Sequence, residues 1–275
     1  MRLLVAEFHK IKNTKILIVL LSLTLSWVGI SVWHFYSLTY AAFLEAAYPP
    51  EDQNPWYAFY FGSGFMFLLA FLLPLVLSLV VFFFKNIEDK ADGWKRLFLL
   101  PFSRFTLHVN KLSAIWVCSV AFIAILFLLF FVSGVLLSWF KPDFKFDQYP
   151  SYHYFLLCFG AKYCGFSLTL VNLCYLVLIT VRRYALSLAT VVLLPLIGPL
   201  MTDSKFNPFS YFINSLHDFL RARARYMSLH EFDAKREVYF SYPMFTLYDV
   251  INLLFVALTM TALYLISKRH SILYD

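Results

Sequence analysis

Six long apolar stretches alternate with shorter polar ones along this chain of 275 residues. The stretches cover residues 15–37, 61–84, 112–139, 155–180, 184–201 and 246–267. Because a helix needs about 20 apolar residues to cross a bilayer, the pattern predicts an all-α protein with six transmembrane helices in a single domain, 1–275. The fifth stretch is short and contains Pro195, Gly198 and Pro199, so we expect it to pack among other helices, which can satisfy the freed carbonyls.

The amino-terminal segment 1–14 shows an amphipathic pattern instead. Leu4, Phe8 and Ile11 share one helical face, while Glu7 and Lys10 lie off that stripe. This spacing predicts a short helix that lies in the membrane interface before the first span. The alternative is that the lysines anchor the first span by charge alone, which leaves the stripe unexplained.

The segment between the second and third spans, 85–111, begins with acidic residues and continues into DGWKRLFLLPFSR. Trp94, Leu97 and Phe98 recur at helical spacing, and Pro101 ends the pattern. Acidic residues ahead of a helix and basic residues within it suit the helix dipole, so a short amphipathic helix is predicted over 94–100. It could lie on lipid headgroups or present an aromatic and basic surface to a cytoplasmic partner, and the pattern alone favours neither.

The longest polar segment, 202–245, contains a helical pattern that opens at Asn207 and Pro208, an N-cap and the residue favoured at the first helical position. Its apolar stripe consists of Phe209, Phe212, Ile213, Leu216, Phe219 and Leu220, and Asn214 lies off the stripe. We expect an amphipathic helix over 207–222 that lies at the outer surface against the spans. The arginines that follow are nearly balanced by acidic residues, which indicates a self-paired surface cluster.

Composition fixes the environment in which these helices act. The chain is 61% hydrophobic and only 14% charged, with a mean hydropathy of +0.71, which excludes a water-soluble fold. The net charge of +7 does not require nucleic acid as a partner, because basic residues orient membrane proteins. They cluster before the first span, in 85–111, at 182–183 and at 268–269, whereas 38–60 has none. With six spans these clusters share one side, so both termini are expected in the cytoplasm.

Few side chains within the predicted spans carry chemistry. Lys162 lies about two turns from the outer end of the fourth span, and we favour an ammonium that reaches the headgroups over a role in a transport pathway. Asp249 is expected at the outer entry of the sixth span. No further buried acid or polar lining indicates an ion-driven transporter or a channel. The four cysteines lie in apolar runs and are expected to pack as small hydrophobic residues: Cys118, Cys158, Cys164 and Cys174.

Motifs of enzymes and cofactor sites are missing from the sequence. The seven histidines form no HExxH pattern, and there is neither a GxSxG motif nor the GxxxxGK[ST] loop that binds ATP phosphates. We therefore expect no catalytic residue, cofactor or metal on this chain. Any energised function must draw on a partner.

Three stretches carry a resemblance to a known family: MRLLVAEFHKIKNTK at the amino terminus, EDKADGWKRLFLLPFSRFTLHVNKL between spans two and three, and NPFSYFINSL after span five. In these the chain resembles the permease subunit of type 2 ABC exporters, in particular the bacitracin-resistance and lantibiotic-immunity permeases. The resemblance implies a protein of the bacterial plasma membrane, surrounded by lipid, that pairs with a second permease protomer. It also implies cytoplasmic ABC ATPase subunits, which bind the ATP and Mg²⁺.

In that family the amino-terminal helix and the loop between spans two and three contact the ATPases. Carried onto this chain, the residues of ATPase coupling would be Glu7, Phe8, Lys10, Glu88, Trp94, Lys95, Arg96 and Pro101. Those of an outer gate would be Phe209, Phe212 and Ile213, and the 202–245 segment is somewhat long for such small permeases. The implied cargo is amphipathic or lipid-like, such as a peptide antibiotic. The main alternative is a non-transporting membrane scaffold or assembly factor, which would not depend on an ATPase.

Overall fold

The structure is a computed structural model that describes residues 16–38, 54–61, 72–90, 103–149, 151–181 and 246–272, together with residues 186, 188–190, 192–193, 214 and 218–222. Every regular element among these residues is helical. The elements are α2 (Ile16–Ser37), α4 (Pro55–Phe61), α6 (Leu73–Lys90), α8 (Arg104–Phe140), the 3₁₀ turns η3 (Pro142–Phe144) and η4 (Phe146–Gln148), α9 (His153–Thr180) and α12 (Leu247–Ile272). The expected all-α class is confirmed for this part of the chain.

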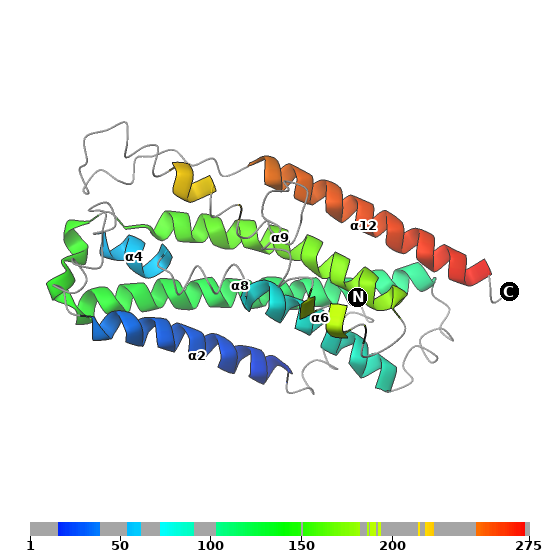
Figure 1. Cartoon of the computed structure of the whole chain (residues 1–275), viewed down its shortest axis with the longest axis horizontal. Coiled ribbons are helices and arrows are strands. Elements are labelled where there is room, and N and C mark those ends of the chain that lie inside the picture. Colours follow the sequence, from blue (N-terminus) through cyan, green and yellow to red (C-terminus); the bar gives the residue numbers. More distant parts are fainter. Residues whose placement is uncertain are drawn as a thin grey trace.

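The long helices lie side by side in one elongated bundle (Figure 1). α8 and α9 form its centre, α2 packs on α8, α12 packs on α9, and α6 contacts both central helices. α2 and α8 run in one direction, whereas α6, α9 and α12 run in the other (Figure 1). The end of α6, the start of α8 and the end of α12 therefore share one end of the bundle, and α4, η3 and η4 lie at the other.

Several helices have the length and composition of membrane spans. Within the described residues, α8, α9 and α12 are long and apolar enough to cross a membrane, and α6 contributes a shorter apolar stretch, Leu73–Asn86. Large apolar side chains are exposed along α2 and α12, with Ile30 62% and Leu253 67% exposed. Such surfaces suit lipid, and we conclude that the chain is a multi-pass membrane protein.

The predicted polar loop 85–111 is wrong at both ends. α6 continues to Lys90, and α8 begins at Arg104 instead of residue 112. The start of α8 is set by Ser103, whose Oγ accepts a hydrogen bond of 3.1 Å from the backbone N–H of Thr106. Both helices thus extend beyond their apolar parts, because polar side chains such as Asn110 can be solvated or bonded along a helix as readily as in a loop. Only 91–103 connects them.

The predicted start of the second span, residue 61, falls at the end of a short helix, α4 (Pro55–Phe61). Phe61 is the last residue of α4, α6 begins at Leu73, and residues 62–71 lie outside the described part of the chain. α4 starts where it does because Asn54 Oδ1 accepts hydrogen bonds from the N–H groups of Trp56 (2.9 Å) and Tyr57 (3.3 Å), with Pro55 at the first helical position.

The remaining predicted elements divide into two groups. The first, third, fourth and sixth spans correspond to α2, α8, α9 and α12, although α12 continues to Ile272. The helices predicted over 1–14 and 94–100 lie outside the described residues, as do most of 184–201 and of 202–245. The count of six spans and the cytoplasmic placement of both termini stay predictions.

Candidate functional site

The residues expected to couple to an ATPase or to form an outer gate fall almost entirely outside the described part of the chain. This holds for Glu7, Phe8, Lys10, Trp94, Lys95, Arg96, Pro101, Phe209, Phe212 and Ile213. Glu88 lies in the last two turns of α6, where only the backbone is described. The polar chemistry that the structure does describe lies between the helices.

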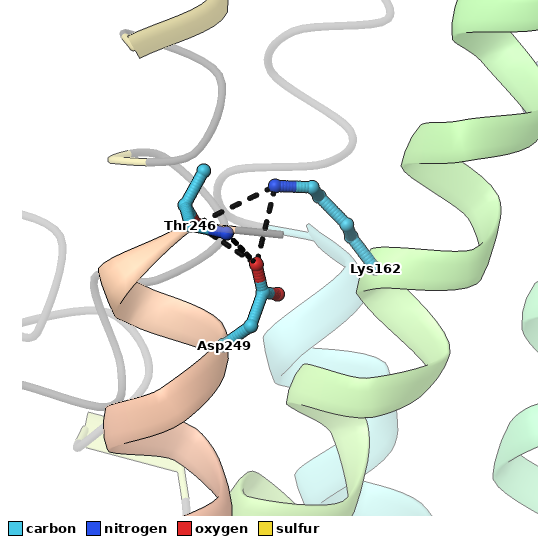
Figure 2. Close-up of polar contacts among 3 residues, drawn as sticks. All are labelled: Lys162, Thr246 and Asp249. Carbon is cyan, nitrogen blue, oxygen red and sulfur yellow. Dashed lines mark hydrogen bonds and ion pairs between the residues drawn. The ribbon is translucent and has the colours of Figure 1, made fainter. Parts of the chain in front are cut away.

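Lys162 is buried against α12, with 6% of its surface exposed. Its Nζ donates to Asp249 Oδ2 at 3.3 Å and to Thr246 Oγ1 at 3.4 Å, so that the ammonium from α9 meets the first turn of α12 (Figure 2). The expectation that this side chain extends to lipid headgroups is therefore wrong. A carboxylate on the neighbouring helix compensates the charge within the protein, where a low dielectric strengthens their attraction.

Asp249 has a second task at the start of α12, where the sequence predicts it. Its Oδ2 also accepts hydrogen bonds from the backbone N–H of Thr246 (2.6 Å) and from Thr246 Oγ1 (2.9 Å). Thr246 followed three residues later by an acid is a capping box, in which the acid satisfies the N–H of the N-cap residue. Asp249 thus caps α12 and pairs with Lys162 through the same oxygen. The two hydrogen bonds from Thr246 are shorter than the contact between Asp249 and Lys162. They define the start of α12, and the ion pair then holds this start against α9.

A second polar contact joins the same two helices further along. Thr169 Oγ1 lies 2.5 Å from Asn252 Oδ1 and 3.1 Å from Asn252 O. Both oxygens are acceptors for its single hydroxyl proton. Asn252 Nδ2 in turn donates to Gly165 O at 3.1 Å. Asn252 is 4% exposed and Thr169 is fully buried, so water does not compete for these groups.

A third contact adds α8. Asn172 Nδ2 donates to Thr259 Oγ1 on α12 at 3.1 Å, and Asn172 Oδ1 accepts from Trp116 Nε1 on α8 at 2.9 Å. One amide therefore joins three helices. Nearer the opposite end of α8, His108 Nδ1 and Tyr175 Oη lie 2.9 Å apart, a further bond between α8 and α9.

These contacts form one continuous feature, which we call the polar seam: Lys162, Thr169 and Asn172 of α9 with Asp249, Asn252 and Thr259 of α12. On each helix the spacings are three and seven residues, which places the members on one face. Because α9 and α12 are parallel, the pairs follow in the same order on both helices. The seam offers hydrogen bonds between helices, and the described residues contain no group of three His, Cys, Asp or Glu side chains that could hold a metal ion.

A second cluster, the aromatic cap, lies at the end of the bundle that contains α4. Trp56 donates from Nε1 to Phe146 O at 2.9 Å, and its ring packs edge-on against Phe146 and His153. Phe61 of α4 and Phe159 of α9 both pack on Phe219, at ring-centre distances of 4.9 and 5.0 Å. Burial raises the pKa of the Tyr60 hydroxyl, which stays protonated and donates to Phe131 O on α8.

The described residues 218–222, which include Phe219 of the aromatic cap, belong to the helix predicted over 207–222. Residues 218–222 are helical and Phe219 is fully buried, so the apolar stripe faces the bundle at this point as predicted. Asn214, which lies off the predicted stripe, is also buried, with 7% of its surface exposed.

Two parts of this site had sequence signals. Asn54 followed by Pro55 is the same helix-start pair as Asn207 and Pro208, and Thr246 with Asp249 matches the capping-box pattern ahead of an apolar run. These signals locate the start of α4 and the role of Asp249. No comparable local signal marks Asn172, Asn252 or Thr259 as bonded across helices, because single polar residues in an apolar run can also bond to their own helix.

Comparison with known proteins gives one family. The profile of the family described as ABC-2 family transporter protein matches residues 3–198, from near the start of the amino-terminal segment into the predicted fifth span. No curated protein and no solved structure matches the chain. The matched region contains α2 to α9, so the polar seam joins it to α12, which lies beyond the match.

Proposed function

The chain belongs to the ABC-2 family of transporter proteins, and we propose that it is the permease subunit of an ATP-driven exporter. The family match over residues 3–198 is the observation that carries this proposal, because it establishes a membrane transport component. The multi-pass helical bundle supports it. Energy would come from separate ABC ATPase subunits in the cytoplasm, which would hold the ATP and Mg²⁺.

The connection 91–103 is the proposed contact with the ATPases, through Trp94, Lys95, Arg96 and Pro101, together with Glu88 and, from the amino-terminal segment, Glu7, Phe8 and Lys10. The support comes from the helices on either side, because α6 ends at Lys90 and α8 begins at Arg104. α8 is 37 residues long, about 55 Å at the usual helical rise, so a displacement at its start can be carried as a rigid-body movement to the aromatic cap. Phe209, Phe212 and Ile213 would close the exit there.

The cargo we propose is amphipathic or lipid-like, and a peptide antibiotic of the bacitracin or lantibiotic type is the specific candidate. The side chains of the seam are paired between helices, and the described helices expose many large apolar and aromatic side chains, which suit a cargo taken from the bilayer. Two permease protomers in the bacterial plasma membrane, with their termini in the cytoplasm, complete the proposed assembly.

Purification from the native membrane in mild detergent tests the assembly. We expect an ABC ATPase to be recovered with the chain, whereas recovery without any ATPase would favour a scaffold or assembly factor. In the purified complex, Trp94→Ala should retain ATP hydrolysis and lose its stimulation by cargo. Trp33→Ala is the matched control, because Trp33 is 71% exposed on α2, away from the connection, and should leave coupling unchanged.

Cells that lack the protein test the cargo. Their sensitivity to bacitracin and to a panel of lantibiotics should rise, and restoring the intact chain should reverse the effect. Unchanged sensitivity to every compound would remove the antibiotic as cargo and leave the permease role to be judged on ATPase recovery.

A further inference from the structure

A pocket of about 560 Å³ opens at the end of α8, beside the aromatic cap. It is lined by side chains of two kinds, the rings of Trp56 and Trp139 and the polar groups of Ser138, Lys145, Asp147 and Gln148. The volume falls within the range of small-ligand sites in proteins. Nothing in the proposed transport function assigns a role to this pocket.

The inner wall of the pocket is preformed. Trp56 is 7% exposed, and its Nε1 is bonded to Phe146 O at 2.9 Å. The Trp56 and Phe146 rings meet edge to face with their centres 4.8 Å apart. Because the indole N–H is already satisfied, the wall presents a fixed aromatic surface to whatever enters.

The polar side of the pocket depends on an unusual backbone conformation. Lys145 joins η3 to η4 with φ 52° and ψ 42°, the left-handed region, and it is the one non-glycine residue with positive φ among those described. Its N–H bonds to Pro142 O at 2.9 Å, and the two turns hold it there. A lysine pays a conformational cost in this region, and such residues are concentrated at binding sites.

The pocket lies at the expected depth of lipid headgroups. Residues 112–140 contain no charged side chain, and Lys141 is the first after them. The last residues of α8 are exposed aromatics, Trp139 at 73% and Phe140 at 70%, and Lys141 Nζ lies 4.5 Å above the ring of Tyr36. Exposed aromatic rings followed by lysines are typical of the boundary between hydrocarbon and headgroups.

We propose that this pocket binds the headgroup of a zwitterionic phospholipid, such as phosphatidylethanolamine. Lys145 and Asp147 supply one positive and one negative charge at the same opening, which complement the phosphate and the ammonium of one headgroup. An ammonium is also attracted to the face of an indole ring, which Trp139 offers at the rim. The acyl chains remain in the bilayer, to which the exposed end of α8 is adjacent.

The test uses the full chain with its co-purifying subunits in nanodiscs that contain equal amounts of phosphatidylethanolamine, anionic phosphatidylglycerol and an uncharged glycolipid. Lipid retained after detergent extraction is counted by native mass spectrometry. We expect phosphatidylethanolamine to be retained about tenfold over the other two, and Lys145→Ala with Asp147→Asn to abolish this preference. Equal retention of the three lipids by the unmodified chain would overturn the proposal.

The neighbouring charges provide a matched control. Lys141→Ala with Asp143→Asn removes the same two charges four residues earlier, from side chains that do not line the pocket, and should preserve the preference. If both double variants lose the preference for phosphatidylethanolamine equally, the effect is one of general surface charge, and the proposed site is overturned. Thermal unfolding of the Lys145→Ala with Asp147→Asn variant should match the unmodified chain, since both side chains are exposed.

Free phosphoethanolamine distinguishes a lipid from a soluble ligand. If the pocket requires the lipid, millimolar phosphoethanolamine should leave the retained phosphatidylethanolamine unchanged. Complete displacement would show that the soluble compound binds as well as the lipid and would overturn the choice of a phospholipid. Neither result depends on the ATPase, so failure of this site leaves the proposed transport function standing.

Discussion

The polar seam and the aromatic cap hold helices together by different physical means. Lipid tails are as apolar as leucine, so apolar contact by itself gives little preference for one helix over another inside a bilayer, and hydrogen bonds and close packing decide which helices pair. At the end of the bundle, where chain and solvent meet, burial of aromatic rings removes them from water. The seam therefore specifies which residues of α9 and α12 meet, and the cap supplies buried area.

The comparison also explains why α9 occupies the centre. α9 carries three polar side chains of the seam on one face and contributes Phe155 and Phe159 to the aromatic cap, together with Tyr152 at its N-cap. α2, in contrast, shows exposed side chains over much of its length. A helix that takes part in both kinds of contact becomes buried, whereas one that lacks a second partner remains facing lipid or another subunit.

The largest expected effect comes from breaking the ion pair of the seam on its acidic side. Asp249→Ala should lower the free energy of unfolding by about 3–5 kcal/mol, because Lys162, with a side chain 4% exposed, loses this carboxylate, and the cap of α12 is lost as well. Lys162→Met should cost less, since Asp249 keeps both bonds from Thr246 and is 17% exposed. The measurement is unfolding in mixed micelles with increasing dodecyl sulfate.

A double variant tests whether Lys162 and Asp249 stabilise the fold through their contact with each other. Lys162→Met with Asp249→Ala should cost less than the sum of the two single changes, because no unpaired charge then remains between the helices. Strict additivity would mean that the two side chains stabilise the fold independently and that the short contact in Figure 2 contributes nothing.

The aromatic cap is tested by Phe219→Ala, for which we expect a loss of about 3 kcal/mol in the same measurement. The side chain is fully buried against Phe61, Phe155 and Phe159, so its removal leaves a cavity that rigid rings fill poorly. Phe140→Ala, at a ring 70% exposed, is the control and should change stability little. Equal effects of the two changes would contradict the packing described for the cap.

The smallest of the three effects should follow from Asn172→Leu. This change removes the bonds to Trp116 and Thr259 while preserving approximate volume, and hydrogen bonds between membrane helices contribute about 0.6 kcal/mol each, so we expect a loss of about 1 kcal/mol. Thr261→Val on α12 removes a hydroxyl that bonds only within its own helix, to Ala257 O, and is the matched control. A loss no greater than that of the control would show that Asn172 does not join the helices.

Local pattern predicted the parts of the molecule that depend on neighbouring residues. The apolar runs gave α2, α9 and α12 close to their observed limits, and the stripe containing Phe219 gave the buried face of 218–222. The errors arose where an apolar run and a helix differ in extent. α8 extends eight residues ahead of its predicted start because Ser103 caps it, and α6 continues to Lys90, past the predicted end of the second span at residue 84.

The sequence by itself determined that this is a helical membrane protein, and its residues 3–198 determined its family. Only the tertiary structure decided that Lys162 meets Asp249, 87 residues away, and that Asn172 meets both Trp116 and Thr259. The physical reason is that periodicity and caps act within a few residues and fix where a helix starts and which face is polar. The partner of a polar side chain depends on which helices pack together and in what register, and that is set by the contacts of the whole bundle.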